Sequence, residues 1–222
     1  DRIDQVSVQR WDGASTLAGE LFLILLNDGS GRLRVQSRIT GNVLGAAMLL
    51  DLYVKRRITL RDMTIDVVVK QPLPTDRLTR RTLGWLLYEP EQVGVSSWVQ
   101  ALATTAVDDV AEHLETAGWI RREPMRRGRT RYEPVIPNRV FWRAGRLAQS
   151  VHGDAHGPDP FLFALVDAAG FAPGLFTASA VPPVPRPHLD EIVRRLADQH
   201  PGVMDLVQVV RDLTARVALA PR

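Results

Sequence analysis

Apolar residues recur at helical spacing along most of this chain, separated by short polar or glycine-rich breaks. Residues 17–26 form an apolar run that stops at Asn27 and Gly29, and residues 41–57 repeat apolar side chains every three or four positions. This spacing places apolar side chains on one face of a helix, and a helix that is apolar around most of its circumference belongs in a core. We therefore predict a buried first helix and a central second helix.

The same periodicity predicts helices through the rest of the chain. With glycine and proline at several boundaries, the predicted helices cover residues 76–88, 95–101, 105–117, 138–152, 160–169 and 188–219, the last with a break at 200–202. Residues 1–15 form a polar N-terminal lead, and the proline-rich residues 178–187 predict an extended internal linker. We expect residues 1–222 to form a single, compact, mainly α domain.

Alternating apolar and polar residues predict a small amount of β-structure. The short segments are a strand at residues 31–36, a hairpin at residues 58–60 and 65–69, and a second hairpin at residues 119–123 and 130–135. Gly128 lies at the tip of the second hairpin and suits the positive φ of a tight turn. The arginines of this hairpin form the densest basic cluster in the chain.

Composition narrows the functional class. The absence of cysteine excludes disulfides, thiolate metal sites and cysteine nucleophiles, as expected for a reducing cytosol. No segment approaches the ~18 apolar residues of a transmembrane helix, and no export leader is apparent. We expect a cytoplasmic protein, peripheral on the inner face of the membrane if it contacts one. The net charge of +3 is small, so only local clustering of arginine can attract an anionic partner.

The residues that carry chemistry in enzymes are not grouped in a recognisable pattern. Residues 152–159 contain two histidines and two aspartates in a glycine-rich turn, but their spacing fits no metal-site signature. Asp108 and Asp109 are adjacent on a predicted helix and so point to different sides. The sequence contains no nucleophile elbow, phosphate loop or dinucleotide fingerprint. We therefore predict no catalytic residue, no metal and no cofactor.

Arginine is the most informative residue type. The candidate side chains for binding an anion or lipid are Arg32, Arg34 and Arg38, before and within the second helix, and Arg126, Arg127, Arg129 and Arg131 in the second hairpin. Guanidinium groups bind phosphate through paired, charge-assisted hydrogen bonds. Met125 at the tip adds an apolar contact suited to a membrane surface or to self-association. The alternative is that these arginines form a solvated face that protects the strand edges.

A helix followed by a basic hairpin also resembles part of a winged-helix DNA-binding protein. A recognition helix offers arginine, lysine or amide side chains to the bases. The predicted helix at residues 105–117 instead offers Asp108, Asp109, Glu112 and Glu115, which repel phosphate. Nucleic-acid binding is therefore the alternative hypothesis, and we do not expect it.

Several blocks, taken in order, resemble the Golgi phosphoprotein 3 family. They lie at residues 17–25 (LAGELFLIL), 31–35, 45–52, 57–60, 74–76, 95–99 and 114–122. The resemblance implies a mainly α-helical domain with a projecting β-hairpin. In eukaryotic relatives this domain sits peripherally on the Golgi, binds phosphatidylinositol 4-phosphate and acts as a sorting adaptor. The hairpin of those relatives also takes part in self-association and membrane contact.

The lipid pocket of those relatives is not retained in this sequence. The resemblance places its tryptophan and three arginines at Gln36, Gly45, Thr104 and Val107, and none of these matches. Three guanidinium groups are therefore lost, each of which contributes ~1.5 to 3 kcal/mol to binding a phosphate. We predict a peripheral, adaptor-type protein that docks on anionic membrane lipid or a protein partner, with a homo-oligomer formed through the hairpin as a further expectation.

Overall fold

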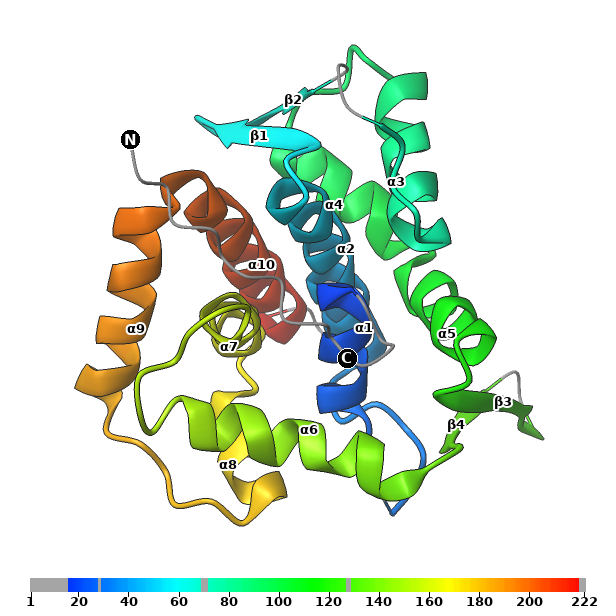
Figure 1. The fold of residues 1–222 in the computed structure, drawn as a ribbon, viewed down its shortest axis with the longest axis vertical. Helices are drawn as coiled ribbons and strands as arrows, with labels where there is room; N and C mark the ends of the chain where they lie inside the picture. Colours follow the sequence, from blue (N-terminus) through cyan, green and yellow to red (C-terminus); the bar gives the residue numbers. More distant parts are fainter. Residues whose placement is uncertain (1–15, 28, 69–71, 127–128, 220–222) are drawn as a thin grey trace.

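The computed structural model describes residues 16–27, 29–68, 72–126 and 129–219 (Figure 1). It confirms a mainly α fold with two small antiparallel hairpins. The helices are α1 (Leu17–Leu25), α2 (Ser37–Val54), α3 (Arg77–Tyr88), α4 (Val95–Ala103), α5 (Ala106–Thr116), α6 (Pro137–Ser150), α7 (Asp159–Ala168), α8 (Ala172–Ser179), α9 (Arg186–Gln199) and α10 (Pro201–Leu219). The strands are β1 (Ile58–Arg61), β2 (Thr64–Val67), β3 (Ile120–Pro124) and β4 (Thr130–Pro134).

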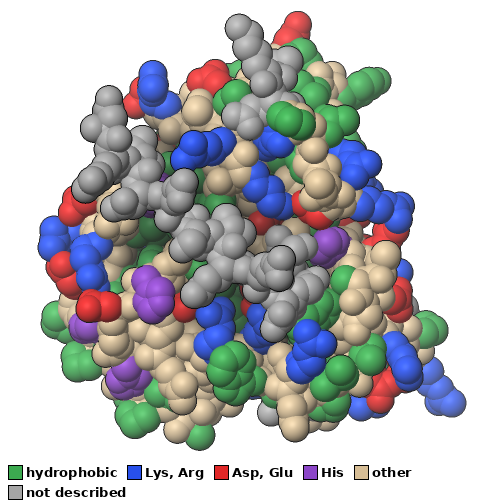
Figure 2. Space-filling model, viewed as in Figure 1, with side chains coloured by type: hydrophobic (Ala, Val, Ile, Leu, Met, Phe, Trp, Pro, Cys, Tyr) green, Lys and Arg blue, Asp and Glu red, His purple; other side chains and the backbone are tan. Residues whose placement is uncertain are grey.

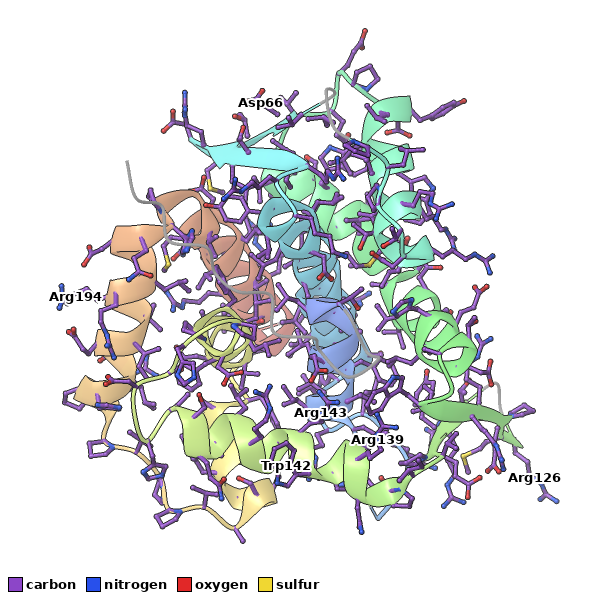
Figure 3. The ribbon with its side chains drawn as sticks, in the orientation of Figure 1. Asp66, Arg126, Arg139, Trp142, Arg143 and Arg194 are labelled. Carbon is purple, nitrogen blue, oxygen red and sulfur yellow. The ribbon has the colours of Figure 1, made fainter. Side chains whose placement is uncertain are left out.

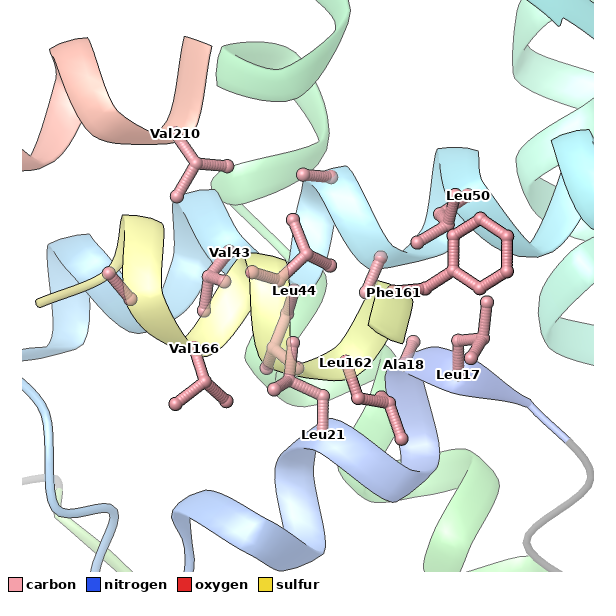
Figure 4. Close-up of a cluster of buried hydrophobic side chains, with 14 of the residues drawn as sticks. Leu17, Ala18, Leu21, Val43, Leu44, Leu50, Phe161, Leu162, Val166 and Val210 are labelled. Atoms are coloured by element: carbon pink, nitrogen blue, oxygen red, sulfur yellow. The ribbon is translucent and has the colours of Figure 1, made fainter. Parts of the chain in front are cut away.

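Helix α2 lies at the centre of the fold, as its apolar circumference predicted. Helices α1, α4 and α10 pack around it, and Figure 4 shows side chains of α1, α2, α7 and α10 meeting in one cluster. Leu21, Leu44, Leu162 and Val210 belong to this cluster and are fully buried. Burial of such side chains contributes about 1.5 to 3 kcal/mol each, which makes this cluster the main source of stability.

The first helix is fixed to the second at its N-terminus. Thr16 caps α1 by accepting a hydrogen bond from the Gly19 N–H at 3.0 Å. The buried carboxylate of Asp51 on α2 accepts hydrogen bonds from the Leu17 and Ala18 N–H groups at 2.7 and 3.1 Å. Burial raises the pKa of Asp51 to about 7, although Lys55 and these two N–H donors oppose the increase. The contact orients α1 against the central helix.

The second hairpin, β3–β4, projects from one corner of the molecule (Figure 1). Its register places Arg121 opposite Glu133 and Glu123 opposite Arg131. On its other face, the buried Tyr132 packs edge-to-face on Phe22 of α1, with ring centroids 5.0 Å apart. The base of the hairpin is therefore part of the core, while its tip extends into solvent.

The first hairpin, β1–β2, is also confirmed, with Asp62 and Met63 at positive φ in its turn. Residue 69, the predicted end of its second strand, lies outside the described residues, as do the predicted polar lead at residues 1–15 and the turn residue Gly128.

Two sequence predictions of local structure were wrong. Residues 31–36 do not form a strand; Leu33 makes one isolated bridge to Leu26, and α2 begins at Ser37, before the predicted start. Helix α8 was not predicted, because Pro173 and Gly174 are typical of loops. It forms because Leu175 and Phe176 are buried, with α8 packed on α6. The non-helical stretch before α9 is correspondingly shorter than the predicted linker at residues 178–187.

Candidate anion-binding surface

The arginines at the tip of the β3–β4 hairpin point into solvent. Arg126, Arg129 and Arg131 are exposed, and within the described residues their guanidinium groups form no hydrogen bond or ion pair. In Figure 3, Arg126 extends away from the body of the molecule. The neighbouring candidate Arg127 lies outside the described residues. We call Met125, Arg126 and Arg129 the hairpin tip; the Met125 N–H closes it by donating to the Arg129 carbonyl at 2.7 Å.

The lower part of the hairpin is closer to electrical neutrality than its sequence indicates. Glu115 of α5 accepts hydrogen bonds from the Arg122 N–H at 2.9 Å and from the Arg122 Nε at 2.7 Å, and these bonds lower the pKa of Glu115. Arg121 and Arg131 each face a glutamate across the two strands. The excess positive charge of the hairpin is thus concentrated at its tip.

The hairpin base is held against α6 and α1 by a stack of cations on an indole ring. Arg139 and Arg143 lie over the buried Trp119, with 4.4 and 4.8 Å between each guanidinium carbon and the ring centroid. Arg143 also forms an ion pair with Glu20 of α1, which is fully buried. Burial raises the pKa of Glu20, and the charge of Arg143 opposes that increase.

The candidates near the second helix are divided between two places. The loop that carries Arg32 meets strand β4, because the Tyr132 N–H donates to the Gly31 carbonyl at 2.7 Å. Gly31 has φ of +64°, and a Cβ there would lie 2.7 Å from the Cγ of Arg131, so only glycine fits. Arg34 donates from Nε to the Leu26 carbonyl at 3.3 Å and is therefore engaged in the loop itself. Arg32 is exposed beside the hairpin. Arg38 lies apart from it, in the first turn of α2.

Arg38 lines a groove of about 370 Å³ between three helices. The lining residues are Arg38 and Asn42 from α2, Gln100, Ala103 and Thr104 from α4, and Leu213, Arg216 and Val217 from α10. Of the described side chains that line this groove, two carry a guanidinium group and none carries a carboxylate. Arg216 could not be found from the sequence, because only the fold brings the end of α10 beside the start of α2. Gln36, the N-cap of α2, makes no side-chain capping bond.

Helix packing beside the groove explains one difference from the lipid pocket that the resemblance to eukaryotic relatives implies. Thr104 lines the groove, but Gly45 lies in the contact between α2 and α4. A Cβ at Gly45 would be 2.9 Å from the Val99 carbonyl oxygen, so an arginine could not occupy this position. The basic side chains that line the groove are therefore Arg38 and Arg216.

Three acidic side chains of α5, Asp109, Glu112 and Glu115, are paired with arginines of neighbouring elements. Asp109 forms an ion pair with Arg81 at 2.7 Å, and Glu112 one with Arg77 at 3.1 Å. Helix α5 packs on α1, α2 and α3. Its acidic side chains thus serve to connect the helices, and the helix does not offer the donors that reading base edges requires.

The histidines and aspartates of residues 152–159 diverge in the structure. The His152 Nε2 lies 2.7 Å from the Pro182 carbonyl oxygen, and the His156 Nδ1 lies 2.7 Å from that of Asp154. Asp159 pairs with Arg146 at 3.1 Å. Among the residues that the structure describes, no three His, Asp or Glu side chains are grouped as metal ligands.

The helices were also compared with the requirements of a membrane span. In the described part of the chain no single helix is both long and apolar enough to cross a bilayer; α7 and α8 meet the criteria only as a pair, which is bent by 115°.

Comparison with known proteins gives one informative match. No curated protein sequence matches the chain significantly. The sequence model described as Golgi phosphoprotein 3 (GPP34) matches residues 17–213, from the start of α1 into α10. This match includes the central helices, the β3–β4 hairpin and most of the groove, whose Arg216 and Val217 lie beyond it. The chain therefore belongs to the Golgi phosphoprotein 3 family.

Proposed function

We propose that this chain is a non-catalytic, peripheral membrane protein that docks on anionic lipid through the arginines of its β3–β4 hairpin. The observation that carries the proposal is the difference between the hairpin tip and the body. Arg126 and Arg129 are exposed without an ion pair among the described residues, whereas Arg81, Arg143 and Arg146 are paired with buried carboxylates. Only unpaired guanidinium groups are available to a phosphate.

The expected interaction is weak and reversible. A basic side chain near an anionic leaflet contributes about 1 kcal/mol, and this attraction decays within about 10 Å at 0.1 M salt. The few arginines of the tip therefore give an affinity that depends strongly on salt. The net charge of +3 is too small to replace such a local cluster.

The groove between α2, α4 and α10 is the proposed site for a single phosphorylated headgroup. Arg38 and Arg216 line it, and both are exposed without an ion pair in the described part of the chain. A phosphate between them would accept charge-assisted hydrogen bonds from both guanidinium groups. Hairpin and groove would then separate two roles: attraction to the surface and retention of a headgroup.

Vesicle co-sedimentation tests the proposal. The full chain should bind vesicles that contain phosphatidylserine and not vesicles of phosphatidylcholine alone. Replacing Arg126, Arg127 and Arg129 together by alanine should reduce binding at least tenfold, from the loss of about 1 kcal/mol per side chain. The control is alanine at Arg61, Arg77 and Arg194, which removes the same charge from exposed positions on β1, α3 and α9.

The outcomes are distinct. If the hairpin variant binds as the wild type does, the assigned role of the hairpin is wrong. If the wild type binds no anionic vesicle, the lipid proposal fails and a protein partner becomes the favoured occupant. With phosphatidylinositol 4-phosphate in the vesicles, Arg38→Ala with Arg216→Ala should remove any additional binding that this headgroup confers.

A further inference from the structure

We propose that the outer face of α6, centred on Trp142, is a second membrane contact beside the hairpin. This inference rests on the proposed function, since it concerns the same anionic surface. Trp142 is 61% exposed, whereas Trp98 and Trp119 are buried. Tryptophan is enriched at membrane interfaces because its ring is apolar while its N–H still reaches a polar partner.

The charge around Trp142 favours an anionic surface. Residues 137–150 contain three arginines and no acidic residue. Arg143 and Arg146 are neutralised by the buried Glu20 and Asp159. Arg139, one turn before Trp142, has no carboxylate partner within the described residues and lies over the Trp119 ring. Among the described residues of α6, the charge next to Trp142 is therefore neutral to positive, which favours contact with a lipid phosphate.

The second exposed aromatic side chain of the described residues has opposite surroundings. Tyr88, at the end of α3, is 84% exposed. The loop that follows it, Tyr88-Glu89-Pro90-Glu91-Gln92, carries two glutamates and no basic residue. An anionic membrane would repel this loop. Local charge thus selects Trp142, and not Tyr88, for contact with the bilayer.

Trp142 and the hairpin belong to one continuous border of the molecule. Val135 and Ile136 connect β4 to α6, and both are exposed apolar side chains. In Figure 3, Trp142, Arg139 and Arg126 follow one another along the border formed by α6 and the hairpin. Figure 2 shows basic side chains along the same lower right border, over the hairpin. A flat surface that touches this border can contact the hairpin and α6 together.

Tryptophan fluorescence and vesicle co-sedimentation test the inference. Vesicles with phosphatidylserine should shift the emission of the full chain to shorter wavelength, and Trp142→Phe should abolish that shift. Trp142→Ser should weaken vesicle binding roughly tenfold, because an apolar ring no longer enters the interface. Tyr88→Ser is the matched control and should bind as the wild type does. Both positions are exposed, and unchanged thermal unfolding midpoints would verify that each variant folds.

Each result decides between the two proposals. If Trp142→Ser binds like the wild type while the hairpin variant does not, the α6 contact is refuted and the hairpin role stands. If Tyr88→Ser weakens binding as much as Trp142→Ser, the assigned orientation is wrong. If the wild type binds no phosphatidylserine vesicle, both proposals are overturned.

Discussion

At the residue scale, the ion pair between Glu20 and Arg143 places a buried charge in the core of the described fold. Glu20 is fully buried, and its Oε2 has no hydrogen-bond partner within the described residues. Arg143 is thus the charge that compensates this carboxylate. We expect Arg143→Met to lower the free energy of unfolding by about 3 to 5 kcal/mol, because a buried charge loses its partner. Urea denaturation at pH 7 measures the change.

The companion variant separates charge from packing. Glu20→Gln together with Arg143→Met removes both charges and should restore most of the stability lost in Arg143→Met alone.

Arg143→Met should also raise the pKa of Glu20 further. The folded protein then binds a proton more tightly than the unfolded chain, so this variant should lose stability as pH rises above about 4.5. A variant that is equally stable at pH 5 and pH 7 would contradict this explanation.

Such pairings are what the sequence could not predict. Glu20 falls in an apolar run and Arg143 lies 123 positions away, so no local pattern connects them. The same is true of Arg38 and Arg216, which only the packing of α10 on α2 brings together. The sequence did identify the arginines of the hairpin tip, because they are adjacent. It did not indicate that Arg122 is engaged by Glu115.

At the element scale, two glycines of α2, Gly41 and Gly45, determine how closely this helix approaches α4. A Cβ on Gly41 would lie 2.6 Å from the Ala103 carbonyl oxygen. Because this neighbour is a backbone atom of α4, the clash could be relieved only by shifting the helix. We expect Gly41→Ala to lower the free energy of unfolding by about 1 to 3 kcal/mol through overpacking. Gly84→Ala is the control: Gly84 is exposed in α3 with open space around it, and alanine there should stabilise by about 0.5 to 1 kcal/mol. Equal effects at both sites would refute the close-contact explanation.

The elements show where sequence periodicity succeeds and where tertiary packing overrides it. The central helix was predictable because most positions of α2 are apolar, and the hairpin β3–β4 because two short strands flank a polar tip. Helix α8 was not, since a proline and a glycine precede its buried Leu175 and Phe176. The alternation at residues 31–36 was misleading because the segment pairs only through an isolated bridge between Leu33 and Leu26 at the end of α1, and α2 begins at Ser37.

At the scale of the whole molecule, the family match covers the core, the β3–β4 hairpin and α6 in one continuous stretch of sequence. Residues 17–213 include most of the buried helical core and also the hairpin, α6 and the part of the groove formed by α2 and α4. The exposed arginines therefore project from a scaffold whose stability comes from apolar burial around α2. Substitutions at the hairpin tip should accordingly change binding and leave unfolding unchanged, whereas substitutions at Glu20 or Gly41 should do the reverse.

The last helix should be indispensable to that scaffold. Helix α10 packs on α2, α4, α7 and β1. Its buried side chains are Val203, Leu206, Val207, Val209, Val210 and Leu213. At about 1.5 to 3 kcal/mol each, their burial is comparable to the total stability of a typical domain, about 5 to 15 kcal/mol. We expect the full chain to unfold in one cooperative transition, and a chain that ends at Ala180 to lose both that transition and the near-ultraviolet circular dichroism of its buried tryptophans. A sharp transition in the shortened chain would instead make α9 and α10 a separate folding unit.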